Sequence, residues 1–182
     1  MLVIGLGHPD RADDGVGPLV AARLGVAARR AHCAHIEVAE SRGDVLALMD
    51  RWSARDLVVL VDAAVAVGEP GRIHRIDASC GVLSRELALS STHAVGVAET
   101  LALAAALGRL PRRMIIYAVE ATCFQPGAPM TAEVLKAAER LLESIPEELR
   151  GLQAELEAAL PGDRSGLSGE VSCADADSPA RA

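Results

Sequence analysis

Short aliphatic runs recur along the chain at intervals that suit a buried β-sheet. The runs over 2–4, 57–61 and 114–119 are continuous and rich in β-branched residues, as is typical of strands covered on both faces. A further short strand is predicted over 36–39. Residues 72–76 alternate polar and apolar side chains, which predicts a strand with one solvent-facing side at the edge of the sheet.

Helices are predicted between these strands, and in the first of them apolar residues recur in steps of four. The predicted helices cover 15–28, 45–52, 93–107 and 132–145. Asp13 or Asp14 is the candidate N-cap of the first helix, and Thr131 that of the last. Because strands and helices alternate, we predict an α/β fold. It is a three-layer sandwich with a mostly parallel, twisted sheet of about five strands and helices on both faces.

The pattern changes after residue 145. Residues 1–145 form the predicted α/β domain. Leucines at 149, 152, 156 and 160 then mark one face of an additional amphipathic helix over 146–160, which packs on the domain or on a second subunit. Residues 161–182 are rich in Gly, Ser, Asp and Ala and are predicted to be disordered. We expect a monomer or a weak homo-oligomer.

Composition and charge narrow the class of protein. With 182 residues, of which 51% are hydrophobic, the chain can bury the core of one domain. Its formal net charge is −7 and no basic stripe runs along it, which argues against a nucleic-acid partner. None of its 4 cysteines forms a CxxC pair, and no apolar run reaches the length of a membrane helix. The first strand follows Met1 without a secretory signal, so we expect a cytoplasmic protein with no membrane partner.

Three residues with metal-ligating or catalytic side chains fall at corresponding places in this layout. Asp14 follows the first strand, Asp62 ends the central strand, and His93 opens the long helix. Parallel strands bring the two carboxylates to the same edge of the sheet, where a returning helix can place the imidazole beside them. Two carboxylates and one imidazole suit an exchangeable divalent transition metal ion.

Each of the three residues also has a structural explanation. Asp14 suits the positive end of a helix dipole, and Asp62 can bond to nearby backbone N–H groups. His93 can be a semi-buried residue at a helix start. These residues alone do not distinguish a metal site from the structural roles.

Gly5-Leu6-Gly7 lies between a strand and a helix, as glycines do in dinucleotide-binding folds. Asp10 stands where that motif has its third glycine, and the carboxylates of Asp13 and Asp14 would repel a pyrophosphate. We therefore expect these glycines to let the strand and the helix pass closely.

Other polar residues lie near the same predicted edge. His8 could be an additional ligand or a polarising group. Glu120, at the end of the last inner strand, could line the pocket or pair with Arg11. Cys123 has no evident base beside it, which disfavours a thiol nucleophile.

The opening stretch GLGHPDRADDGVG, residues 5–17, resembles the signature of the hydrogenase maturation proteases, the endopeptidases that process the large subunit of nickel–iron hydrogenases. An aliphatic strand that reaches Asp62 and a histidine that opens a long helix, His93, match two further landmarks of that family. Val-Glu at Glu120, followed by residues 125–127, is similar to the family's Val/Ile-Glu-Pro segment and the loop after it. The resemblance spans the predicted α/β domain.

The resemblance implies an activity, a partner and a site. The family removes a C-terminal extension from a nickel-loaded large-subunit precursor and is grouped with the aspartic-type peptidases. Carried over by position, the metal-contacting residues are Asp14, Asp62 and His93, and the two carboxylates are the candidate catalytic residues. Nickel is then supplied in the substrate, so the isolated protein can hold no ion or another divalent ion. His8 stands where the family has Asn, which bears on the geometry of the first loop.

Two other classes of function fit parts of the pattern. One is a non-catalytic, metal-dependent binding module or maturation chaperone on the same fold. The other is a nucleotide-binding α/β domain, against which the acidic first loop counts.

Overall fold

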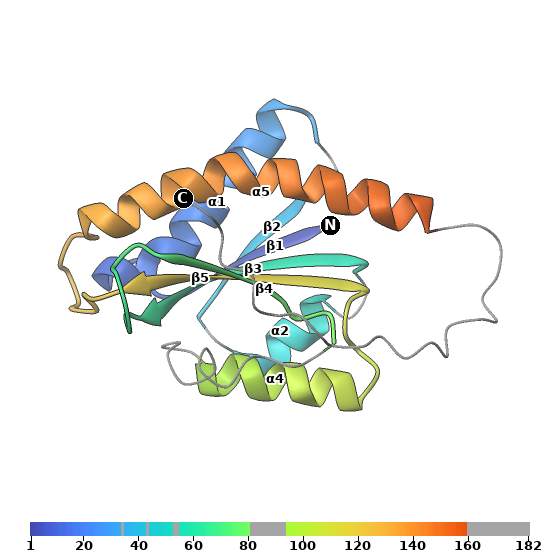
Figure 1. The fold of residues 1–182 in the computed structure, drawn as a ribbon, viewed down its shortest axis with the longest axis horizontal. Coiled ribbons are helices and arrows are strands. Elements are labelled where there is room, and N and C mark those ends of the chain that lie inside the picture. The colour runs from blue at the N-terminus through green and yellow to red at the C-terminus, as the bar shows by residue number, and fades with distance from the viewer. Residues whose placement is uncertain (34, 43, 53–54, 81–93, 160–182) are drawn as a thin grey trace.

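A five-stranded sheet forms the centre of the molecule (Figure 1). The computed structural model describes residues 1–33, 35–42, 44–52, 55–80 and 94–159. Residues 81–93, which include the first residue of the predicted helix over 93–107, and the predicted disordered tail lie outside the described residues.

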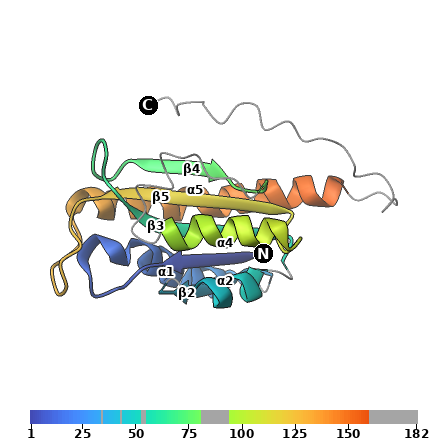
Figure 2. The same cartoon turned by 90° about the horizontal axis from the view of Figure 1, so that it is seen from below.

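The strands are β1 (Leu2–Leu6), β2 (Glu37–Ser41), β3 (Leu57–Val65), β4 (Ile73–Asp77) and β5 (Arg113–Ala121). They lie in the order β2-β1-β3-β5-β4. β1 pairs in parallel with both β2 and β3, and β3 pairs in parallel with β5. β4 runs antiparallel to β5 along one edge (Figure 2), as its polar–apolar alternation predicts. The α/β class with a mostly parallel five-stranded sheet is therefore confirmed.

Helices cover both faces of this sheet. A 3₁₀ turn, η1 (Ala12–Gly15), leads into α1 (Val16–Arg30), and α1 packs with α5 (Ala132–Ala158) on one face. On the other face lie α2 (Val45–Trp52) and α4 (Ala94–Ala106) (Figure 1). The predicted three-layer sandwich is confirmed. None of the helices in the described part of the chain combines the length and the hydropathy that crossing a membrane requires.

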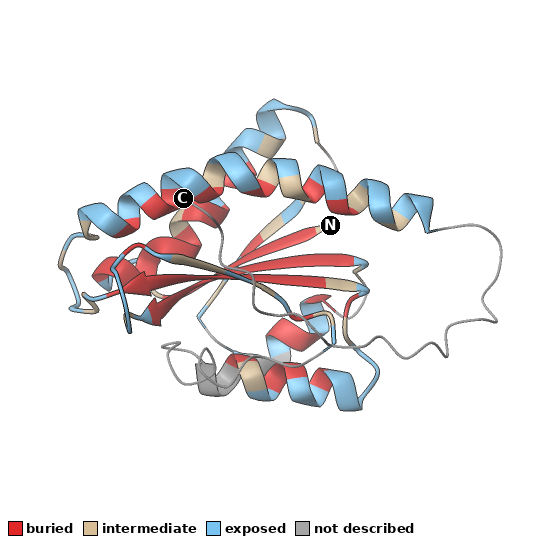
Figure 3. Ribbon diagram, in the orientation of Figure 1, coloured by how far each residue is buried: buried red, intermediate tan, exposed pale blue. Residues whose placement is uncertain are grey.

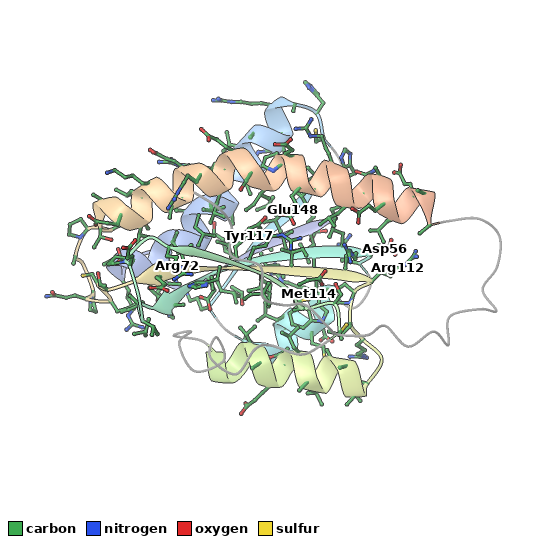
Figure 4. All side chains as sticks on the ribbon, viewed as in Figure 1. Asp56, Arg72, Arg112, Met114, Tyr117 and Glu148 are labelled. Carbon is green, nitrogen blue, oxygen red and sulfur yellow. The ribbon has the colours of Figure 1, made fainter. Side chains whose placement is uncertain are left out.

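Each face of the sheet has its own apolar core, because successive side chains point to opposite sides of a strand. Tyr117 faces α1 and α5, whereas Met114 faces α2 and α4 (Figure 4). The central strands are buried along their length, and the exposed residues lie on the outer sides of the helices (Figure 3). With few aromatic residues, Val, Leu, Ile and Ala fill most of both cores, and Trp52 lies in the second of them.

The sequence predicted that the central strand ends at Asp62, but β3 runs past this residue. It continues to Val65, because its last four residues pair with 118–121 of β5. The pairing of β1 with β3 stops at Gly5 and Val61. Asp62 therefore lies within a strand, at the first position beyond the β1–β3 ladder.

α5 is one continuous helix where the sequence predicted two. Pro146 lies inside α5 and does not start a new helix. A proline within a helix removes a backbone hydrogen bond, but Leu149 and Leu152 beyond it are buried in the same core as the first half of the helix. An ion pair from Glu148 to Arg75 of β4 also ties the second half to the sheet. Burial and this pair explain why the helix continues.

Two glycines let α1 pack directly on the sheet. A Cβ on Gly17 of α1 would lie 2.2 Å from the carbonyl oxygen of Leu6 and 2.5 Å from that of Val61. A Cβ on Gly5 of β1 would lie 2.1 Å from the carbonyl oxygen of Gly17. These neighbours are backbone atoms of packed elements and cannot turn aside. The predicted close passage of strand and helix at Gly5 is confirmed.

Gly17→Ala should lower the free energy of unfolding by about 1–3 kcal/mol, because the added methyl group forces α1 away from β1 and β3. Gly151→Ala is the matched control. This glycine lies in α5 with nothing within 4 Å of an added Cβ, and alanine there should raise stability by about 0.5–1 kcal/mol. Urea unfolding followed by circular dichroism gives both values. A Gly17→Ala protein as stable as the wild type would contradict the close packing.

Candidate active site at the carboxyl end of the sheet

Two of the three predicted site residues lie at one end of the sheet. β1, β3 and β5 all finish at the end that lies on the left of Figure 1, where α1, α4 and α5 begin. Asp14 lies in η1, just after β1, and Asp62 lies in β3 next to β1. The third predicted residue, His93, lies outside the described residues, directly before the first residue of α4. Parallel pairing therefore brings the two carboxylates to a common edge.

The carboxylate of Asp14 is fully buried and folds back onto its own loop. Its Oδ2 accepts a hydrogen bond from the backbone N–H of His8 at 3.0 Å. The same oxygen lies 3.4 Å from the His8 ring Nδ1 and 3.9 Å from an Arg11 guanidinium nitrogen. Gly7 makes this fold possible, because its φ is +127° and a Cβ there would lie 1.9 Å from the Asp14 carbonyl oxygen. His8 and Arg11 thus contact a proposed site residue directly.

Asp62 is also buried, with 3% of its surface exposed. Its Oδ1 accepts a hydrogen bond at 2.9 Å from the backbone N–H of Ala63. Along β3 it follows Val58 and Leu60 on the side of the sheet that faces α2 and α4. The carboxylate therefore interrupts an otherwise apolar row, between Leu60 and Ala64.

Asp13 has a different role from the N-cap that the sequence suggested. The N-cap position of α1 is Gly15, and no side chain caps that helix. The buried Asp13 carboxylate instead accepts hydrogen bonds from the backbone N–H groups of Thr122 and Cys123, at 3.1 and 3.0 Å, on Oδ2. Its Oδ1 accepts two more from Thr131, from the backbone N–H at 2.7 Å and the hydroxyl at 2.9 Å.

These four bonds join η1 to the segment that connects β5 with α5. Thr131 occupies the predicted N-cap position of α5, but its hydroxyl bonds to Asp13 and makes no capping bond. The backbone of Cys123 both donates to the Asp13 carboxylate and accepts from the Asp13 N–H at 3.0 Å. The side chain next to Asp14 is therefore fixed by a second loop that is remote in the sequence. The acidic pair in the sequence draws attention to Asp13, but no sequence pattern predicts which groups donate hydrogen bonds to it.

Glu120 does not pair with Arg11, which the sequence left open. Its Oε1 lies 2.8 Å from Nε2 of His74 in β4, and its Oε2 accepts a hydrogen bond at 2.8 Å from the Gly68 N–H. Burial raises the pKa of Glu120, but the hydrogen bonds from His74 and Gly68 and the electrostatic attraction of His74 and Arg72 lower it by more. The net pKa lies below the ordinary value of 4.5. The alternation along β4 predicts a strand but gives no sign of the partner of His74.

The donor set at this end of the sheet fits a metal ion only in part. Within the described ranges, no group of three or more His, Cys, Asp or Glu residues could hold a metal ion. Those ranges include Asp14 and Asp62 but not His93. Two buried carboxylates at one edge can neutralise a cation and leave coordination positions for ligands from a substrate.

The fold and these carboxylates define the class as an α/β protein with an acidic site at the carboxyl end of a parallel sheet. A model of the hydrogenase maturation protease family matches residues 36–148. The chain belongs to this family. The matched range includes Asp62 and His93, whereas Asp14 lies in the opening stretch before it.

Several solved structures share the fold. The hydrogenase maturating endopeptidase HybD from Escherichia coli aligns with a TM-score of 0.67 and 20% identity, over 82% of this chain and 91% of that chain. An Escherichia coli endopeptidase solved in solution gives 0.69 and 21% over the same shares. The [NiFe] hydrogenase maturation protease HybD from Thermococcus kodakarensis gives 0.61 and 20%, over 81% and 97%. A comparison with curated proteins gives no match.

Asp13→Asn should lower the free energy of unfolding by about 2–4 kcal/mol. The carboxylate accepts four hydrogen bonds, and the NH₂ group of the amide cannot accept the two that would point at it. Asp10→Asn, an exposed residue of the same loop, is the matched control and should change stability little. Chemical unfolding of both variants at pH 7 gives the comparison. Equal stability of the two variants would show that the Asp13 bonds do not hold the loops together.

Glu120→Gln should lower the free energy of unfolding at pH 7 by about 1–3 kcal/mol, because hydrogen bonds to a charged acceptor are replaced. The folded-state pKa of Glu120 is lowered, so its contribution is fully present above the ordinary glutamate pKa of 4.5 and is lost as pH falls through the lower value. The difference between wild type and variant should therefore shrink from pH 6 to pH 3. Glu139→Gln, exposed on α5, controls for the loss of one surface charge. A difference that stays constant over this range would contradict the lowered pKa.

Proposed function

We propose that this protein is an endopeptidase that removes the C-terminal extension of a nickel-loaded [NiFe] hydrogenase large-subunit precursor. Membership of the hydrogenase maturation protease family supports the peptidase class. The observation that carries the proposal is the placement of Asp14 and Asp62. Both are buried carboxylates: Asp14 follows β1, and Asp62 lies in the neighbouring parallel strand β3 at the first position beyond its pairing with β1.

In this proposal, nickel is part of the substrate and is bound by the precursor. Asp14, Asp62 and His93 contact it when the precursor docks, as the family resemblance implies. Carboxylate and imidazole groups are ordinary ligands of divalent transition metals, and a site that shares its ion with the substrate needs open coordination positions. The contact places the scissile peptide next to the two carboxylates.

The reaction is hydrolysis of one peptide bond. Water adds to the carbonyl carbon, the C–N bond breaks, and the products are a new C-terminal carboxylate and the amine of the released peptide. In one route, Asp14 or Asp62 accepts a proton from the attacking water as general base. In the other, the carbonyl is polarised by the substrate's nickel. The aspartic-type grouping corresponds to the first route.

Asp62→Asn should reduce the processing rate of the nickel-loaded precursor at least about 100-fold while the protein stays folded, because the amide can neither accept a proton nor neutralise a cation. Asp14→Asn and His93→Ala should do the same. Asp56→Asn is the matched control, since this exposed residue lies beside the opposite end of β3 from Asp62 (Figure 4). The readout is the mass of the precursor C-terminus over time.

The same assay tests the alternative function. Wild-type rates in the Asp62 and Asp14 variants would overturn the site assignment. A wild-type protein that binds the precursor in a nickel-dependent way, without any change in precursor mass, would be a binding module or chaperone and not a peptidase.

A further inference from the structure

A row of polar side chains continues from Asp62 across the sheet to β4. Asp62 pairs in register with Ala118 of β5, and Ala118 pairs with His74 of β4. Glu120 lies two residues beyond Ala118. Residues in register and residues two apart share a face, so Asp62, His74 and Glu120 all lie on the α4 side. Towards the other end of the strands, this face is apolar, as at Met114.

The geometry of the His74–Glu120 pair fixes the orientation of the imidazole ring. Glu120 is buried, whereas 27% of the His74 side chain is exposed. An ionised carboxylate can only accept hydrogen bonds, so Nε2 of His74 carries the proton in their 2.8 Å contact. In the neutral ring, Nδ1 then carries the lone pair and can accept a hydrogen bond. Among the described residues, Glu120 is the one partner of this ring.

Hydrogen bonds that do not involve His74 hold the segment that connects β3 to β4, which crosses the end of β5 because β5 lies between these two strands. Gly68 donates its N–H to the Glu120 carboxylate, Gly71 donates its N–H to the Glu120 carbonyl at 2.7 Å, and Glu120 donates its own N–H to Arg72 at 2.8 Å. Backbone groups of this segment thus make three hydrogen bonds with Glu120, one to its carboxylate and two with its backbone. The imidazole is an additional group at this end of the sheet.

The distance from Asp62 to His74 suits an extended peptide. The two residues are in register on strands separated by β5, and neighbouring strands lie about 4.8 Å apart, which gives roughly 10 Å. An extended chain covers that distance in about three residues. A peptide whose scissile bond lies at Asp62 and that runs across β5 at the level of Ala118 therefore reaches His74 within about three residues.

We propose that His74 is a substrate-positioning residue that accepts, at Nδ1, a hydrogen bond from a backbone N–H of the precursor about three residues from the scissile bond. Glu120 holds the ring in the orientation that this bond requires. This inference rests on the proposed function, because it takes the cleaved precursor as the ligand.

Two substitutions separate the two nitrogens of the ring. The amide of His74→Gln reaches the Nε2 position and can keep the bond to Glu120, but it leaves no acceptor at the Nδ1 position. The shorter His74→Asn keeps an acceptor at the Nδ1 position and loses the bond to Glu120. Initial rates over a range of concentrations of each nickel-loaded large-subunit precursor from the source organism give kcat and KM for both variants. A titration of the same precursors gives Kd without requiring cleavage.

We expect His74→Gln to raise KM and Kd roughly two- to tenfold, the worth of one hydrogen bond, with kcat within about twofold of wild type. His74→Asn should be less impaired. A structural role would give the reverse order, with His74→Gln like wild type and His74→Asn impaired.

Unchanged KM and Kd in His74→Gln, or that reverse order, would overturn the assignment while leaving the peptidase function intact. If the wild type binds a precursor without cleaving it, the proposed function fails, and the Kd of His74→Gln alone decides the role of His74. If no precursor binds, both proposals are overturned.

Discussion

The position of the candidate site depends on one buried charge, the carboxylate of Asp13. Removing a carboxylate from water is costly, and the cost is offset only when hydrogen-bond donors replace the lost water. The donors here come from the segment between β5 and α5, more than a hundred residues further along the chain. The loop that carries Asp14 therefore cannot move unless Asp13 leaves its donors. Asp13 has a structural role and Asp14 a proposed functional one, and the hydrogen bonds of Asp13 fix the position of Asp14 next to it.

Unequal strand lengths create the second constraint. β3 and β5 pair as far as Val65 and Ala121, whereas the pairing of β1 with β3 stops at Gly5 and Val61. Beyond that point β3 has a partner on one side only within the sheet, and Asp62 is the first residue in this overhang. On the α4 face, the polar Asp62 follows the aliphatic Val58 and Leu60 at this point. The buried carboxylate of Asp62 thus coincides with the end of the β1–β3 ladder.

Most of the architecture could be predicted from local pattern, because an aliphatic run such as 57–61 fits little else than a strand covered on both faces. The boundaries could not. Asp62 resembles a strand end because it is polar, yet pairing with β5 carries the strand past it. Pro146 resembles a helix start, yet the buried leucines after it keep the helix continuous.

The partners of polar residues were the least predictable part of the site. The sequence predicts that Asp14 and Asp62 lie at the same end of the sheet, and the parallel pairing of β1 with β3 puts both there. The donors of Asp13 and the imidazole beside Glu120 come from segments whose spacing carries no periodic signal. Such partnerships are decided by how the loops and the edge strand β4 pack in three dimensions. They were visible only once the sheet order was known.

The length of α5 sets the directions from which large molecules can meet this protein. Its 27 residues span roughly 40 Å at 1.5 Å per residue (Figure 1). The helix begins next to Thr131, which bonds to the Asp13 carboxylate, and ends at the opposite end of the sheet. Ion pairs of Arg113 in β5 with Glu155 and of Arg75 in β4 with Glu148 fasten its distal half there. The helix is thus a strut along the whole molecule, and a reporter group fused behind Ala158 would start at the pole opposite the acidic edge. A bulky folded partner could then occupy that edge without meeting the attached group.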